Sequence, residues 1–178
     1  MYIRVASFFI AWKTMNTEQQ IELKATLRNI LSPVAKDLAL YISGIELITN
    51  AQGLSVTIYL DGPQGVSIDS CAAFTRQSSP ILDVEDPIAS AYTLEVSSPG
   101  FNRLVEIPED FKRFESYRIR VKLFHKKKKI DGVLVSSDEN EFVLAGESST
   151  RTISYSDCSS VRLLPTPEQY EQLAPKPI

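Results

Sequence analysis

The residues best suited to do chemistry in this chain are basic, and they are concentrated in one segment. Residues 101–130 contain ten lysines and arginines against four acids, whereas residues 15–100 contain four bases against ten acids. The formal net charge of −3 conceals this reversal. Clustered cations bind polyanions, because neutralising phosphates releases the counterions condensed around them. The basic segment therefore predicts contact with a nucleic acid backbone.

The highest density of positive charge is in the four consecutive lysines that follow His125. They lie between two expected strands, at the tip of a hairpin. The first of these strands alternates basic and apolar residues. Together they give a predicted RNA-binding site of seven residues: Arg118, Arg120, Lys122, Lys126, Lys127, Lys128 and Lys129. The lysine run alone could equally be a solvated turn that protects an edge strand from pairing. The alternating cations beside it favour RNA contact.

Residue patterns typical of catalysis or metal binding are missing from the sequence. His125 is the only histidine, and its lysine neighbours disfavour its protonated form. Cys71 and Cys158 show neither a CxxC pair nor the Cys/His spacing of zinc sites, and we expect both to be buried, reduced thiols of a cytoplasmic protein. Phosphate-binding glycine loops and nucleophile elbows are also absent. We therefore expect no enzymatic activity, no cofactor and no metal.

The elements that must position the basic residues begin with a helix–strand–strand–helix–strand order. We expect a helix over 18–39, with Thr17 as N-cap and a kink or split at Pro33. Strands follow at 41–49 and 54–60, joined as a hairpin, then a helix capped by Ser67 and a strand at 92–97. Two helices packed on one face of a three-stranded sheet would bury that face.

From about Arg118 the pattern changes to five short strands separated by turns, which predicts a small barrel and an α+β fold class overall. We divide the chain into an N-terminal extension at 1–14, an α/β domain at 15–98, a linker at 99–116, the barrel at 117–165 and a tail at 166–178. The extension, which ends before a second methionine, is expected to be disordered or not native. Its apolar stretch is too short to span a bilayer, so we expect no membrane contact.

One run of residues is distinctive: Tyr92-Thr93-Leu94-Glu95-Val96-Ser97-Ser98-Pro99-Gly100. Together with Asp61-Gly62-Pro63-Gln64-Gly65 and Leu82-Asp83-Val84-Glu85-Asp86-Pro87-Ile88, it resembles the RimP family of bacterial ribosome maturation factors. The family pattern continues as Leu-Asp-Arg-Pro-Leu, where this chain has Phe101-Asn102-Arg103-Leu104-Val105. Arg103 matches that pattern, whereas its acid and its proline are replaced.

The resemblance implies a cytoplasmic, non-catalytic protein, expected to be a monomer, that binds the free small (30S) ribosomal subunit and helps it mature. The implied partners are rRNA and a ribosomal protein of the decoding centre, and the implied second domain is SH3-like, close to the Sm fold. Ser97, Ser98, Pro99, Gly100 and Arg103 are expected to fix the pose of the two domains or to contact a partner. The acidic first domain would attract basic extensions of ribosomal proteins.

Three other functions stay open. One is a general RNA-binding or RNA-chaperone protein with an Sm-like barrel. Another is an enzyme acting on RNA or nucleotides. The third is a protein adaptor that uses the exposed edge of the first sheet.

Overall fold

The computed structural model describes residues 16–50, 53–124, 128–147 and 149–173. The expected N-terminal extension therefore lies outside the described residues. The chain divides into two compact units at Ser98 and Pro99. None of the described helices is long and apolar enough to cross a membrane.

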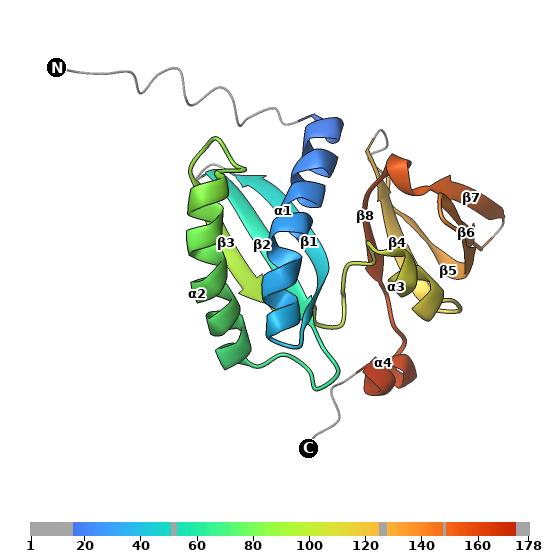
Figure 1. Ribbon diagram of the computed structural model, residues 1–178. Helices are drawn as coiled ribbons and strands as arrows, with labels where there is room; N and C mark the ends of the chain where they lie inside the picture. The colour runs from blue at the N-terminus through green and yellow to red at the C-terminus, as the bar shows by residue number, and fades with distance from the viewer. Residues whose placement is uncertain (1–15, 51–52, 125–127, 148, 174–178) are drawn as a thin grey trace. The chain divides into compact units, whose positions relative to one another are not determined.

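The first unit has the predicted order of elements. It contains α1 (Thr17–Asp37), β1 (Tyr41–Asn50), β2 (Gly53–Asp61), α2 (Ile68–Glu85) and β3 (Tyr92–Ser97). β1 pairs antiparallel with β2 as the expected hairpin, and β2 pairs in parallel with β3, which gives the sheet order β1-β2-β3. Both helices lie in front of this sheet in Figure 1. The predicted three-stranded sheet with two helices is confirmed.

The core of the first unit follows from the alternation along β2. Leu54, Val56, Ile58 and Leu60 point to the helices and are at most 5% exposed. Buried leucines and a phenylalanine of the two helices pack against them: Leu23, Leu27, Leu31, Phe74 and Leu82. Because every second residue of a strand points to the same face, this apolar set anchors both helices on one side of the sheet.

The start of α1 differs from the sequence prediction. Asn16, rather than Thr17, is the N-cap, since its side chain accepts a hydrogen bond from the backbone N–H of Gln19 at 2.9 Å. The Gln19 side chain in turn accepts from the backbone N–H of Asn16 at 3.0 Å, which completes a capping box. Asn and Thr both cap helices well, so the sequence was compatible with either Asn16 or Thr17 as the N-cap.

Of the two outcomes expected at Pro33, a kink or a split of the helix, the split is wrong. The helix continues through this residue from Thr17 to Asp37. Proline removes one helical hydrogen bond and crowds the preceding turn. Buried residues on both sides of Pro33, namely Leu31, Val34 and Ala35, belong to the core of the first unit. Their burial holds both parts of the helix against the sheet and offsets the loss.

The second unit contains α3 (Pro108–Arg113), β4 (Arg118–Leu123), β5 (Ile130–Ser137), β6 (Glu141–Ala145), β7 (Thr150–Ser154), a 3-10 turn (Tyr155–Asp157), β8 (Cys158–Leu163) and α4 (Pro167–Leu173). Its five strands form one antiparallel sheet in the order β7-β6-β5-β4-β8. The separate five-stranded unit agrees with the change of pattern in the sequence.

The closed SH3-like barrel is not confirmed, because the described pairings do not join the two edge strands, β7 and β8. The sheet must nevertheless curl. Only the 3-10 turn separates Ser154, at the end of β7, from Cys158, at the start of β8. An extended connection of that length spans about 14 Å, whereas the edges of a flat five-stranded sheet lie about 19 Å apart.

Residues 99–116, expected to form a linker, contribute to the core of the second unit. Val105, Phe111 and Phe114 are at most 2% exposed. The backbone N–H of Val105 donates to the carbonyl of Val161 at 2.9 Å, so this segment runs beside β8. Apolar residues in a short helix and its approach segment were compatible with either a linker or a core. Their burial shows that this segment is integral to the second unit.

Candidate nucleic-acid interface

The basic residues of β4 lie on the face of the sheet opposite the core. Ile119 and Val121 are fully buried. Arg118 and Lys122 are exposed, and Arg120 is partly exposed. The alternation seen in the sequence therefore separates an apolar inner row from a cationic outer row on one strand.

Arg120 is held by an acid on the next strand. Its Nε donates to Oδ1 of Asp131 at 2.8 Å and its Nη2 donates to Oδ2 at 2.6 Å. The two residues are direct partners in the β4–β5 register. The hydrogen bond from Arg120 is the largest influence that lowers the pKa of Asp131 below its ordinary value, and the charges of Arg118 and Lys129 act in the same direction. Sequence reasoning missed Asp131, because strand register was not known.

A further arginine extends the cationic row onto β8. Arg162 is the register partner of Arg120 on the other side of β4. Its Nη1 donates to the backbone oxygen of Asn102 at 2.9 Å. Arg162 was also missed, although Val161-Arg162-Leu163 carries the same apolar–basic–apolar signal as β4.

Two of the four consecutive lysines can be placed. Lys128 and Lys129 are exposed just before β5, whereas Lys126, Lys127 and His125 lie outside the described residues. The charge of Lys129 helps to lower the pKa of Asp131. We define the basic face by its described cations, which are Arg118, Arg120, Lys122, Lys128, Lys129 and Arg162.

The family-signature residues Ser97, Ser98, Pro99, Gly100 and Arg103 include both exposed and buried side chains. Ser97 and Ser98 are exposed. Gly100 adopts a positive φ of 58°, which glycine accepts without strain. Pro99, Gly100, Phe101 and Asn102 line one side of a groove of about 630 Å³ in the second unit, and residues 162–165 of β8 and its continuation line the other.

Arg103 is the buried member of this group, at 5% exposure. Its guanidinium lies over the ring of Phe114, 5.2 Å from the ring centroid. Its carbonyl accepts a hydrogen bond from the backbone N–H of Leu163 at 3.0 Å. Both of these contacts lie within the second unit.

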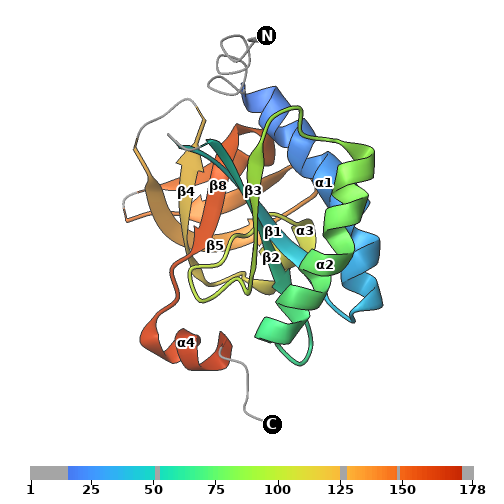
Figure 2. The ribbon, with the colours of Figure 1, turned by 90° about the vertical axis from the view of Figure 1, so that its left-hand side faces the viewer.

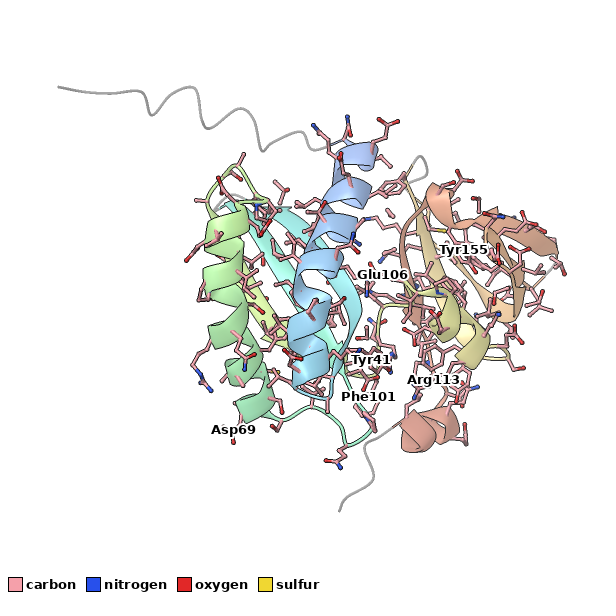
Figure 3. All side chains as sticks on the ribbon, in the orientation of Figure 1. Tyr41, Asp69, Phe101, Glu106, Arg113 and Tyr155 are labelled. Carbon is pink, nitrogen blue, oxygen red and sulfur yellow. The ribbon has the colours of Figure 1, made fainter. Side chains whose placement is uncertain are left out.

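Two aromatic residues of this region, Phe111 in α3 and Phe114 at its end, are buried and therefore unavailable for base stacking. Phe111 is buried and packs against Phe142 and Tyr155, with ring centroids 5.0 and 4.7 Å away. Phe114 is buried beneath two arginines. Tyr155 is labelled in Figure 3 on the second unit. Bases could not stack on rings that already lie in the core.

The described residues offer no candidate metal site, and the two thiols are weakly nucleophilic. No group of three or more His, Cys, Asp or Glu side chains is arranged to hold a metal ion in this part of the chain. Cys71 and Cys158 are free and half-buried rather than fully buried. Burial raises the pKa of both thiols, that of Cys158 to about 12 with a contribution from Asp157. Such thiols are poor nucleophiles near neutral pH.

A comparison with known families identifies the first unit. Residues 30–102 match the family model of the RimP N-terminal domain. The match begins within α1 and ends two residues after Gly100, so it includes the whole three-stranded sheet and α2. The resemblance read from residues 61–100 is thereby confirmed.

Proposed function

Because the chain carries a RimP N-terminal domain, we propose that it is a ribosome maturation factor that binds the free small (30S) ribosomal subunit and assists its assembly without catalysis. The domain match is the observation that carries this proposal. The basic face of the second unit supports it, since it offers the chemistry that rRNA phosphates require.

The basic face suits a phosphate backbone rather than individual bases. Its cations lie in rows on neighbouring strands and in the connection that leads to β5. Long, exposed lysines and arginines reach phosphates at variable spacing and carry little sequence information. Arg120 is the exception, because Asp131 already occupies its planar fork. Arg118, Lys122, Lys128 and Lys129 would therefore make most of the phosphate contacts.

Binding would assist assembly by population shift. A factor that binds immature subunits more tightly than mature ones favours the conformation from which assembly proceeds. The groove beside residues 99–102 would provide the protein contact implied by the signature motif, in the second unit. We further propose that the protein acts in the cytoplasm as a monomer, that a decoding-centre ribosomal protein is its partner, and that the curled second sheet is SH3-like.

The test is co-sedimentation of the purified protein with small subunits, large subunits and joined ribosomes over a range of salt concentrations. A face variant, Arg118→Ala/Lys122→Ala/Lys128→Ala, removes three exposed cations from the basic face. A matched control, Lys36→Ala/Arg76→Ala/Lys112→Ala, removes one exposed cation from each of the helices α1, α2 and α3. The net charge changes equally in both.

We expect selective binding to free small subunits. The face variant should bind more weakly, and the slope of log affinity against log salt should fall by about one for each lost phosphate contact. The control should keep the slope of the unmodified protein. Equal slopes for the two variants would exclude the basic face as the RNA contact, and equal binding to every particle would favour a general RNA-binding protein instead.

A further inference from the structure

The first sheet has a free edge at β3. This strand pairs with β2 from Tyr92 to Ser97, and no described residue pairs with its other side. Figure 2 shows the first unit from this side, with α2 beside β3. Alternate residues of an edge strand direct their N–H and C=O groups away from the sheet, where another strand can pair with them.

A groove lies along the beginning of this edge. Its volume is about 510 Å³, within the usual range of ligand clefts, about 300–1,000 Å³. Ser79 and Asp83 of α2 line it on one side, and Tyr92 and Leu94 of β3 line it on the other. Tyr92 and Leu94 are half-buried and alternate with exposed Thr93. A strand added to β3 would therefore place alternate side chains in the groove.

The charge of the groove is negative. Asp83 and Asp86 are its charged lining residues, both exposed, and neither lysine nor arginine is among the described residues that line it. Both carboxylates are close enough to Tyr92 that they add to the effect of burial and raise its pKa. A phosphate backbone would be repelled here, whereas a lysine or arginine side chain would be attracted.

We propose that the free edge of β3 and this groove bind an extended, lysine- or arginine-rich segment of another protein, which joins the sheet as a fourth strand. Backbone hydrogen bonds to β3 supply affinity, apolar side chains of the segment enter the groove beside Tyr92 and Leu94, and its cations reach Asp83 and Asp86. A helical segment would not suffice, because its backbone groups are already paired internally. The site is separate from the basic face, so either could exist without the other.

The test uses the full-length protein and a labelled peptide of about eight residues that alternates lysine and valine, a pattern that forms strands. Binding is measured by fluorescence anisotropy, and backbone amide shifts are followed by NMR. Two control peptides have the same length. One replaces lysine with glutamate, and the other keeps the side chains but carries N-methyl groups on alternate amides, which blocks pairing.

We expect the lysine–valine peptide to bind and to shift the amide signals of Tyr92–Ser97, while both control peptides fail. Asp83→Asn/Asp86→Asn should weaken binding on the order of tenfold at low salt, since it removes two exposed ion pairs. Asn is tolerated at position 86, where φ is 42°. The matched control, Glu22→Gln/Asp37→Asn, removes two exposed acids from α1 and should bind like the unmodified protein.

Three results would overturn the proposal: no binding of the lysine–valine peptide, equal binding of its N-methylated form, or equal weakening by the two acid-to-amide variants. Loss of small-subunit binding in the variants of the basic face would leave this proposal untouched.

Discussion

Arg120 on β4 and Asp131 on β5 meet through two parallel hydrogen bonds, of 2.8 Å and 2.6 Å, in the middle of the basic face. This fork geometry is the one in which a guanidinium binds a carboxylate most specifically. The pair places one acid among six cations. Its charge opposes phosphate binding, while its hydrogen bonds join two neighbouring strands of the same sheet.

Replacing this acid should strengthen RNA binding. In Asp131→Asn the basic face gains one net positive charge, and Arg120 becomes available to phosphate. We expect the affinity for small subunits to rise about twofold to fivefold at low salt and the difference to vanish at high salt. Glu109→Gln, an exposed acid on α3, is the charge-matched control and should change the affinity little. Weaker binding of Asp131→Asn would mean that the pair positions the face for RNA.

The same pair should make stability depend on acid pH. The folded pKa of Asp131 lies below its unfolded value, so the ionised carboxylate stabilises the fold above the unfolded pKa. That contribution is lost as the pH falls through the folded pKa. We expect the protein to be more stable than Asp131→Asn at about pH 7 and the difference to disappear at the acidic end of the range, below about pH 4. Thermal unfolding at several pH values measures it. If the difference in stability between the protein and Asp131→Asn did not depend on pH, its cause would be packing rather than charge.

The sequence alone predicted which basic residues of β4 share a face, but not which residues of the adjacent strands lie beside them. Arg118, Arg120 and Lys122 share a face because the period of a strand is two, and this needs no tertiary information. Asp131 and Arg162 lie beside Arg120 only because of the register of β5 and β8 with β4. Register depends on the geometry and length of the connections between strands, which the sequence did not reveal.

A similar limit applies to segment 99–116. Pro108 lies in the first turn of the short helix α3, a position that suits proline. The sequence did not tell whether Phe111 and Phe114 would pack within the second unit or outside it. Both rings belong to the buried cluster of the second unit, together with residues of its strands.

Gly132 should be essential for packing within the second sheet. A Cβ built on this residue would lie 2.5 Å from the carbonyl oxygen of Ala145 and 2.8 Å from Cγ of Leu144, so β6 would have to move away from β5. We expect Gly132→Ala to lower the free energy of unfolding by about 1–3 kcal/mol, measured by urea denaturation. Gly146→Ala is the control and should cost less, because a Cβ at this residue would lie 3.3 Å from its nearest neighbour, the carbonyl oxygen of Ser149. Equal losses at the two sites would contradict the crowding argument.

Arg103 should matter for stability more than for binding. Arg103→Ala removes a buried side chain that stacks on Phe114, and we expect a loss of about 2 kcal/mol in the free energy of unfolding. Arg103→Lys keeps the charge but loses the planar stack, so it should recover only part of this loss. Urea denaturation gives the stability, and co-sedimentation gives the binding. Normal stability with lost subunit binding would instead show that Arg103 contacts a partner.

The two thiols should differ in reactivity. Burial and the charge of Asp157 raise the pKa of Cys158 to about 12, whereas burial alone raises that of Cys71. The thiolate is the reactive form, so we expect iodoacetamide to modify Cys71 at least about tenfold faster than Cys158 at about pH 8. Mass spectrometry of peptides after timed alkylation measures both rates. Both cysteines should react alike in urea, where neither is buried. Equal rates in the folded protein would show that β8, which begins at Cys158, opens readily to solvent.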